Sequence, residues 1–274
     1  MMPLPPMKSS SDFIVEALDQ PIRILYEDAY LVAVDKPAGL MVHRGANTLP
    51  LEPVLLQVLR DQLQRFLYPI HRLDRPTSGL VLFAFDSRTA SKLGELMMER
   101  RIEKYYQALV RGFMPDELTE TRPLADREPV KRKIDPEHRN TVGSAGPTEL
   151  LSGTNPTETG QSASTHFRCL QRFEVPWPLG EFATSRFSLL EVHPITGRWH
   201  QIRRHLNFLA HPVVGDHRHG DHRWNQMFFE RTGHYRMMLT AMRMDFRHPV
   251  TQEWLTLQAP RGESFDSAVQ AISS

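Results

Sequence analysis

The stretch that most constrains the fold is the nonamer HRLDRPTSG at residues 71–79, which runs directly into the apolar hexamer LVLFAF at residues 80–85. Pro76 has no N–H group to donate to a central sheet ladder, and Gly79 marks a tight backbone position. A short apolar run that follows such residues is typical of a buried strand. The sequence therefore predicts a loop over residues 71–79 that leads into a buried strand.

Asp74 is the single acidic residue of this loop, and Arg72 and Arg75 flank it. Beside a core and near two guanidinium groups, its carboxyl group is expected to stay ionised and to accept hydrogen bonds. Such a group suits a nucleophile better than a proton donor. Asp before Pro and Ser-Gly is also ordinary turn chemistry. From this loop alone, a structural turn and a reactive carboxylate are both open.

The composition limits the compartment and the partners. No apolar run among the 274 residues approaches the roughly 18 residues of a membrane span, and residues 1–20 lack the apolar centre of a signal peptide. We therefore expect a cytoplasmic protein without a membrane partner. Cys169 is the only cysteine, which excludes an intrachain disulfide and a four-cysteine zinc site, and its neighbours Phe167 and Leu170 predict a buried thiol. Because the net charge is only +1, any nucleic-acid site must be a local basic patch.

Hydrophobic periodicity predicts short strands and amphipathic helices. Apolar runs at residues 22–26 and 30–34 indicate a hairpin. One helix follows Pro53 with an apolar face that reaches Phe66, and a second is capped by Asp86 or Ser87 and ends at the basic pair Arg100-Arg101. The remaining predictions are strands at residues 105–110, 165–174, 185–192, 237–246 and 254–257, and a helix at residues 199–209.

Two segments lie outside this pattern. Residues 1–20 are rich in Met, Pro and Ser and predict a flexible tail. Residues 126–165 are rich in Gly, Ser, Thr, Pro and Asn and poor in apolar residues, which predicts a long mobile loop. The rest of the chain, residues 21–274, is predicted to form one domain.

Four sequence blocks match one enzyme family in the same order. The nonamer at residues 71–79 resembles the HRLD-x-x-TSG signature of the RluA-type pseudouridine synthases. The other blocks are KPAG at 36–39 with His43, KYYQALVRG at 104–112 and PITGRWHQIR at 194–203. The resemblance covers roughly residues 22–260.

This resemblance implies the α+β pseudouridine synthase fold, with a mixed, mostly antiparallel sheet flanked by helices and crossed by a basic RNA-binding cleft. It implies conversion of a uridine in RNA to pseudouridine without a cofactor. Residues 21–274 would be the single catalytic domain, without the small S4-like RNA-binding domain that several relatives carry.

The resemblance also implies roles for individual residues. Asp74 would be the nucleophile, attacking either carbon 1′ of the sugar or carbon 6 of the base. Tyr106 would stack on the flipped base and relay the carbon 5 proton, while Arg203 would pair with Asp74 and hold it ionised. Arg72 would fill the gap that the flipped base leaves. Lys36 and His43, in the first block, would be structural.

Arginines and histidines gather between residues 198 and 223. Arg198, Arg203, Arg204, Arg218 and Arg223 face only Asp216 and Asp221 in this segment, which predicts a basic patch. His217, His219 and His222 lack a matching set of carboxylates or cysteines, and His200 and His205 are five residues apart rather than the four that share a helix face. We therefore expect RNA-facing or structural histidines and no metal.

Residues 214–225 are most similar to the branch of the family that modifies uridine 65 of tRNA. Arg204, Arg218, Arg223 and the basic residues 131–133 are predicted to contact tRNA phosphates, since A-form RNA is recognised mainly by shape and backbone. The same chemistry on ribosomal RNA and an inactive RNA-binding homologue are the alternatives, and a monomer is expected. Thr240 stands where many relatives have a histidine, in a motif predicted to pack rather than to react.

Overall fold

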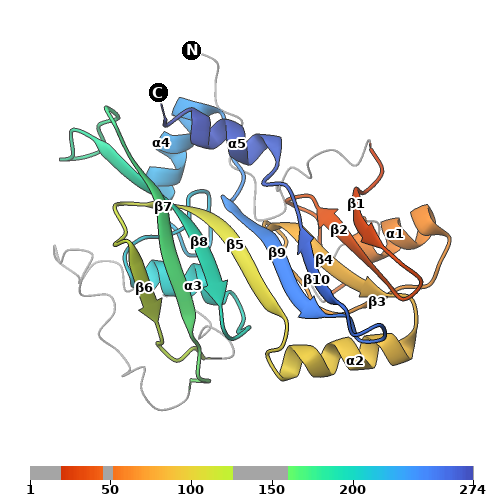
Figure 1. Cartoon of the computed structure of the whole chain (residues 1–274). Helices are drawn as coiled ribbons and strands as arrows, with labels where there is room; N and C mark the ends of the chain where they lie inside the picture. Colours follow the sequence, from red (N-terminus) through yellow and green to blue (C-terminus); the bar gives the residue numbers. More distant parts are fainter. Residues whose placement is uncertain (1–19, 46–51, 126–159, 274) are drawn as a thin grey trace, which may run out of the picture.

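The computed structural model describes residues 20–45, 52–125 and 160–273. Within these ranges the helices are α1 (Leu55–Leu63), α2 (Ser87–Met98), α3 (Gln201–Phe208), α4 (His222–Thr232) and α5 (Glu263–Gln270). The strands are β1 (Ile24–Glu27), β2 (Leu31–Lys36), β3 (Tyr68–Pro69), β4 (Ser78–Ala84), β5 (Glu103–Arg111), β6 (Glu117–Glu120), β7 (Thr165–Val175), β8 (Ser185–Pro194), β9 (Leu239–Arg247) and β10 (Trp254–Gln258). Figure 1 shows their arrangement.

The described strands form one mixed sheet in the order β1-β2-β4-β9-β5-β8-β7-β6, with β3 on β4 and β10 on β9. All of these pairs are antiparallel except β4 and β9, which run parallel. The fold is therefore α+β with a mixed, mostly antiparallel sheet, as the sequence predicted.

The sheet has two halves, one with β1, β2 and β4 and the other with β9, β5, β8, β7 and β6. The short parallel contact between β4 and β9 is the seam that joins them. Ser78 pairs with Thr240 and Gly79 with Ala241, and beyond these two pairs the strands are not paired with each other. Gly79 has φ +102°, and a Cβ atom there would lie 2.2 Å from the carbonyl oxygen of Ala241, so only glycine permits this approach. Because the loop that carries Asp74 leads directly into Ser78, the seam between the halves fixes the position of Asp74.

Strand alternation explains how helices cover both faces of the first half. Along β4, Val81 and Phe83 point to one face and Leu80 and Leu82 to the other, and all four are fully buried. Helix α1 packs on the first face and α2 on the second. A strand that is covered on both faces is apolar throughout, which explains the continuous apolar sequence at residues 80–85.

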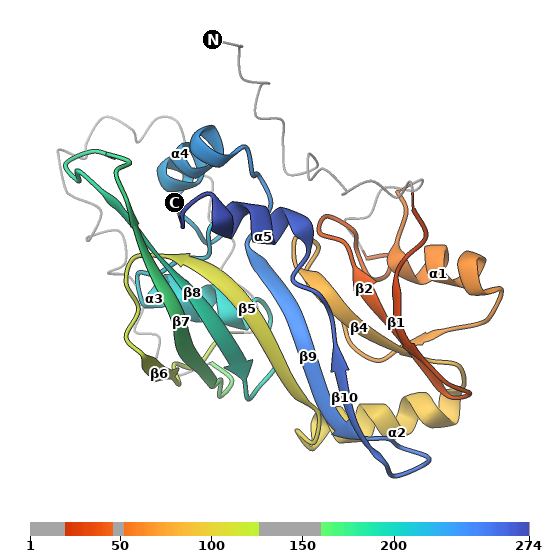
Figure 2. The same cartoon turned by 45° about the horizontal axis from the view of Figure 1, so that its top comes forward.

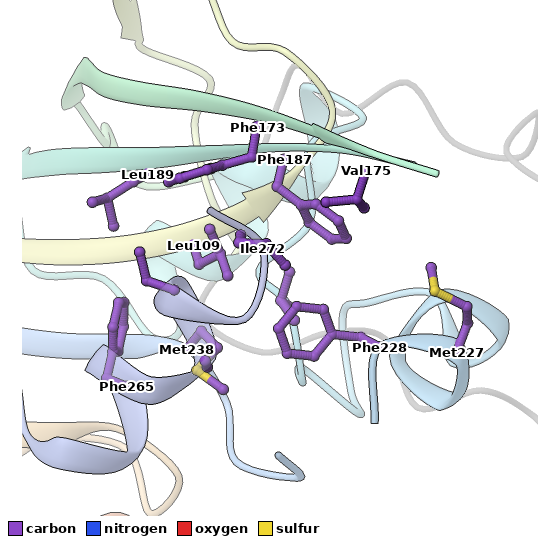
Figure 3. Packing of buried hydrophobic residues seen from close by; sticks show 13 residues of the cluster. Leu109, Phe173, Val175, Phe187, Leu189, Met227, Phe228, Met238, Phe265 and Ile272 are labelled. Carbon is purple, nitrogen blue, oxygen red and sulfur yellow. The ribbon is translucent and has the colours of Figure 1, made fainter. Parts of the chain in front are cut away.

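The second half, built on β5, β8 and β7, is also covered on both faces. Helix α3 packs on one face through Leu206, whereas α4 and α5 pack on the other through Phe228 and Phe265. Figure 2 shows α5 crossing the sheet near the ends of β5 and β9, and Figure 3 shows Phe228 and Phe265 around Leu109 and Met238. Burying an aromatic side chain contributes about 1.5–3 kcal/mol, so these residues anchor both helices.

Most predicted elements are confirmed, with some corrections. The predicted face of α1 was wrong at Phe66, which lies beyond the helix and is 59% exposed. Asp86 does cap α2, but the helix ends at Met98 and Arg100 has φ +59°, so the basic pair lies outside it. Strands β3 and β6 and helices α4 and α5 were not predicted from the sequence. Cys169 is half-buried rather than buried.

Both segments predicted to be flexible fall largely outside the described residues. These are residues 1–19 of the tail and 126–159 of the loop, including the basic residues 131–133. The last residues of the predicted loop are described: Gln161 pairs with Leu124, and β7 begins at Thr165.

Candidate active site

The Asp74 loop is held mainly through backbone groups. The fully buried Lys36 ammonium donates hydrogen bonds to the carbonyl oxygens of Pro37 (2.9 Å), Leu40 (2.7 Å) and Arg75 (3.2 Å). The N–H of Gly39 also donates to the Arg75 carbonyl at 2.8 Å. These bonds join residues 37–40 to the nucleophile loop, which fits the structural role expected for the first sequence block.

The arginines beside Asp74 in sequence are not its partners in space. The Arg75 guanidinium pairs with Glu52 at 2.5 Å and donates to the Gly39 carbonyl at 3.0 Å, and Arg72 is exposed. The partner of Asp74 is Arg203, whose Nη1 donates to Asp74 Oδ2 at 2.9 Å. The Asp74 side chain is 23% exposed, so this ion pair remains open to a ligand.

Arg203 directs its bidentate fork at a second aspartate. Its Nε donates to Asp216 Oδ2 at 2.6 Å and its Nη2 to Asp216 Oδ1 at 2.8 Å. Burial opposes the charge of Arg203, but the hydrogen bonds and charges of Asp216 and Asp74 outweigh burial and raise its pKa. Burial would likewise raise the pKa of Asp216, yet its bonds to Arg203 and to the His219 N–H hold that pKa below the usual value. The pair therefore stays charged.

Residues 214–221 form the loop that holds Asp216, and the first turn of α4 closes it. Asp216 is 1% exposed, and its Oδ1 accepts from the backbone N–H groups of Arg218 and His219. Asn225 closes the loop by accepting from the Gly215 N–H and donating to the Asp216 carbonyl. Gly215 has φ +77° and lies against the backbone of Arg236, where a Cβ would be 2.2 Å from the carbonyl oxygen. Much of the segment predicted to touch tRNA thus supports Arg203.

His200, which was expected to be RNA-facing or structural, is a second neighbour of Asp74. Its Nε2 lies 3.6 Å from Asp74 Oδ2, and its Nδ1 is 2.8 Å from Nε2 of His219. The ring stacks on Trp199 with 3.8 Å between centroids. Burial, then the charge of Arg203 and the neighbouring His219, lower the pKa of His200 to about 2, so the ring is neutral near pH 7.

The turn before α3 explains how His200 reaches Asp74. His200 has φ +50°, a left-handed conformation that costs a non-glycine residue roughly 1–2 kcal/mol. The turn is fixed by Gln201, whose Oε1 accepts from the Thr196 hydroxyl and the Arg198 N–H, and whose Nε2 donates to the Ser164 carbonyl. Strained backbone that its surroundings hold in place is a frequent feature of functional sites.

Tyr106 lies on β5, beside the seam between the two halves. It pairs in register with Ala241 of β9 and Val192 of β8, and its side chain packs against the clusters under both α1 and α3. Burial, and after it the negative charge of Asp74, raises the pKa of Tyr106. Its hydroxyl therefore stays protonated close to the Asp74 carboxylate.

The predicted phosphate-binding arginines do not form one exposed patch. Arg204 is 7% exposed and its Nη1 donates to the Ala125 carbonyl at 2.9 Å, so little of its side chain is open to a phosphate group. Arg218 and Arg223 are exposed, and the Arg218 guanidinium lies 4.8 Å from the centre of the Trp199 ring. Since Arg203 and Arg204 are both buried, counting arginines along the sequence overstated the exposed patch.

The histidines in this region have varied surroundings. His205 is fully buried between the Thr165 hydroxyl and the Arg122 carbonyl, which identifies it as structural. Nowhere in the described ranges does a group of three His, Cys, Asp or Glu side chains form that could hold a metal ion.

None of the helices in the described ranges has the length and apolar character to cross a membrane.

Thr240 is the residue that the sequence resemblance places where many relatives would have a histidine. It is fully buried on β9 opposite Ser78 of β4, in the seam beside the nucleophile loop. Its hydroxyl has no hydrogen-bond partner among the described residues. The position is thus enclosed in the sheet, as expected for a packing residue.

Comparison with known proteins gives consistent results for sequence and fold. A family profile described as RNA pseudouridylate synthase matches residues 30–208. The tRNA pseudouridine synthase C of Vibrio cholerae is 39% identical over 87% of this chain and 90% of its own length, and that of Salmonella typhimurium is 36% identical over 90% and 88%. Among solved structures, the human RNA pseudouridylate synthase domain containing 4 has a TM-score of 0.65 at 23% identity, covering 92% of this chain and 93% of that one. The human domain containing 1 has a TM-score of 0.61 at 22% identity, covering 92% and 95%.

Proposed function

Since the chain belongs to the RNA pseudouridylate synthase family, we propose that it converts a uridine of tRNA to pseudouridine, with Asp74 as the nucleophile. The observation that carries this proposal is the open ion pair of Asp74 and Arg203 at the seam of a pseudouridine synthase fold. The relatives described above are named for the same activity on tRNA, which supports tRNA as the substrate class.

The reaction is an isomerisation and needs no oxidant or reductant. The bond between N1 of the base and carbon 1′ of the sugar breaks, the base rotates, and a bond forms between carbon 5 and carbon 1′. The proton on carbon 5 leaves and N1 gains a proton, so the atoms of uridine are conserved. Asp74 would attack either carbon 1′ or carbon 6 and be released when the new bond is complete.

Arg203 would serve this chemistry by keeping Asp74 ionised. A carboxylate that receives a charge-assisted hydrogen bond favours its charged form, which is the nucleophilic one. Since the fork of Arg203 is committed to Asp216, only Nη1 reaches Asp74. One oxygen of Asp74 thus stays free of this arginine.

Tyr106 and Arg72 would handle the flipped base. Extruding a base costs a few kcal/mol, and stacking on an aromatic side chain returns about 1–3 kcal/mol. Tyr106 lies beside Asp74 and stays protonated, so it is suited to stacking on the base and to donating a hydrogen bond. To relay the carbon 5 proton, its hydroxyl would first have to lose its own proton. Arg72 is exposed two residues before Asp74, where it can enter the gap in the RNA.

The target would be uridine 65, in the stem beside the acceptor arm, as the resemblance of residues 214–225 implies. Arg218 and Arg223, both exposed, are the arginines of this segment that remain suited to phosphate contacts. The expectations of a single catalytic domain, a monomer, a cytoplasmic location and a metal-free site stay predictions.

Purified enzyme incubated separately with bulk tRNA and with ribosomal RNA tests the proposal. We expect pseudouridine in tRNA at one position, and Asp74→Asn to reduce it at least about 10⁴-fold with the fold intact, because an amide is a poor nucleophile. Pseudouridine confined to ribosomal RNA would refute the tRNA assignment. Activity of Asp74→Asn close to wild type would refute the role of Asp74, and an inactive wild type would favour an RNA-binding homologue.

A further inference from the structure

We propose that His200 is a positioning residue for Asp74 and that His219 fixes the tautomer in which His200 acts. The proposal rests on the function proposed above, because it assigns His200 to the support of the same nucleophile. It also predicts a property of the free protein, the place of one hydrogen atom, which can be measured without any substrate.

Arg203 on α3 and His200 in the turn before it both lie next to the same carboxylate oxygen of Asp74. Arg203 Nη1 lies 2.9 Å from Oδ2 and His200 Nε2 lies 3.6 Å from Oδ2. Within the described part of the chain, no group donates a hydrogen bond to Oδ1. This asymmetry holds Oδ2 in place and presents Oδ1 as the oxygen that meets the substrate, whichever carbon is attacked.

The contact with His219 selects one tautomer of His200. One ring donates and the other accepts in this hydrogen bond, so the 2.8 Å contact allows two arrangements. If His200 Nδ1 donated, its Nε2 would direct a lone pair at the Asp74 carboxylate, which is repulsive. If His219 Nε2 donates, His200 carries its hydrogen on Nε2 and directs an N–H at Oδ2. The charge on Asp74 therefore favours the second arrangement.

The surroundings of His200 fix the ring and keep it neutral. Trp199 stacks on one face of the ring, and the left-handed backbone of His200 sets its direction. The charged groups around it are Arg203, Arg218, Asp74 and Asp216, and the low pKa of about 2 agrees with a neutral ring. At 3.6 Å the contact with Oδ2 is too long for a hydrogen bond in the free protein. Such contacts often shorten when the substrate closes the site.

Single-turnover rates on tRNA test the role of His200. His200→Leu removes the donor and should slow the reaction on bound tRNA about tenfold, with the dissociation constant for tRNA within about twofold of wild type. His200→Gln keeps an N–H near the place of Nε2 and should restore the rate to within about threefold. His166→Leu is the matched control, since His166 lies on β7 and contacts Thr119. A wild-type rate for His200→Leu, or a glutamine variant as slow as leucine, would overturn the proposal.

The tautomer is read directly from the wild-type protein by nitrogen NMR of ¹⁵N-labelled histidine. The His200 signals are identified by their loss in His200→Gln. We expect hydrogen on Nε2 and none on Nδ1, and we expect His219→Leu to disturb this pattern whereas His219→Gln, which keeps a donor, preserves it. Hydrogen on Nδ1, or a doubly protonated ring at neutral pH, would overturn the proposal. Failure of the proposed function is a separate result, because it appears as a wild type that modifies neither RNA.

Discussion

Asp74 and Arg203 meet from the two halves of the sheet, and the supports behind them differ in kind. The Asp74 loop is held by neutral backbone carbonyls gathered around the buried Lys36 ammonium. Arg203 is held by the buried carboxylate of Asp216, which in turn takes two backbone N–H groups from its own loop. One support uses a cation and dipoles, and the other uses a pair of opposite charges.

This difference leaves Asp74 reactive and keeps Arg203 fixed. Because Lys36 bonds to carbonyls and not to the Asp74 side chain, the loop is rigid while its carboxylate stays 23% exposed. Because Asp216 takes two N–H groups of Arg203, that arginine cannot turn its whole fork to Asp74 and hold both of its oxygens. We therefore predict that removing the Lys36 contacts lowers stability, whereas disturbing the contacts between Asp216 and Arg203 lowers activity.

Among the substitutions that separate the two supports, Lys36→Met is expected to have the largest effect. The variant leaves the carbonyls of Pro37, Leu40 and Arg75 without the ammonium donor that they share, and of the three only the Arg75 carbonyl keeps the N–H of Gly39. Unsatisfied buried acceptors cost about 1–3 kcal/mol each before relaxation. We expect the free energy of unfolding to fall by about 3 kcal/mol, measured by urea denaturation. The folded fraction should keep most of its activity at low temperature.

Lys92→Met is the control for this substitution. Lys92 lies on α2 and its ammonium donates to one carbonyl, that of Pro249, at 3.2 Å. Its loss should change the free energy of unfolding by less than about 1 kcal/mol. Equal stability of the two variants would show that the Lys36 cluster contributes little to holding the loop.

A smaller effect, on activity, is expected for Arg203→Lys. A lysine keeps the charge but cannot contact Asp216 through two N–H groups and Asp74 through a third. We expect kcat/KM on tRNA to fall by roughly 30-fold, about 2 kcal/mol of transition-state stabilisation. Arg168→Lys is the control, because Arg168 makes a surface ion pair with Glu191 on the sheet. A lysine enzyme as active as wild type would show that the fork of Arg203 does not matter.

The fold and the nucleophile loop could be predicted because their signals are local. The run at residues 80–85 is apolar throughout because both faces of β4 are covered, and Gly79 is required by the approach of Ala241. Helix α4 was missed although Asp221 caps its start and Gly233 follows its end. Both are recognised helix signals, but the surrounding arginines and histidines were interpreted as a binding surface.

The support of Arg203 could not be predicted, because a charge count along the chain treats each residue as independent and exposed. Arg203 and Asp216 cancel each other in the interior, and Arg204 is buried one position away from Arg203. Gly215 and Gly220 on either side of Asp216 were the available signal, since glycine is favoured where the backbone needs a positive φ or a close approach. His200 was missed because its contact with Asp74 depends on a left-handed residue before α3.

The smallest effect is expected for the double variant Arg218→Gln and Arg223→Gln. This variant tests what residues 214–225 do beyond supporting Arg203. Both side chains are exposed, so their loss should weaken tRNA binding by about 1 kcal/mol and reduce the slope of log affinity against log salt by about one per lost phosphate contact. Arg88→Gln with Arg101→Gln removes the same charge from the first turn of α2 and from the segment after that helix, and should affect neither quantity as much. An unaltered salt slope in the double variant would mean that this loop serves Arg203 and that the RNA is held by another surface.

The variant Arg204→Gln should instead lower stability, because the Arg204 guanidinium donates to the Ala125 carbonyl inside the protein. If Arg204→Gln weakened tRNA binding and reduced the salt slope as the loss of a phosphate contact does, the phosphate contact predicted for Arg204 would be supported.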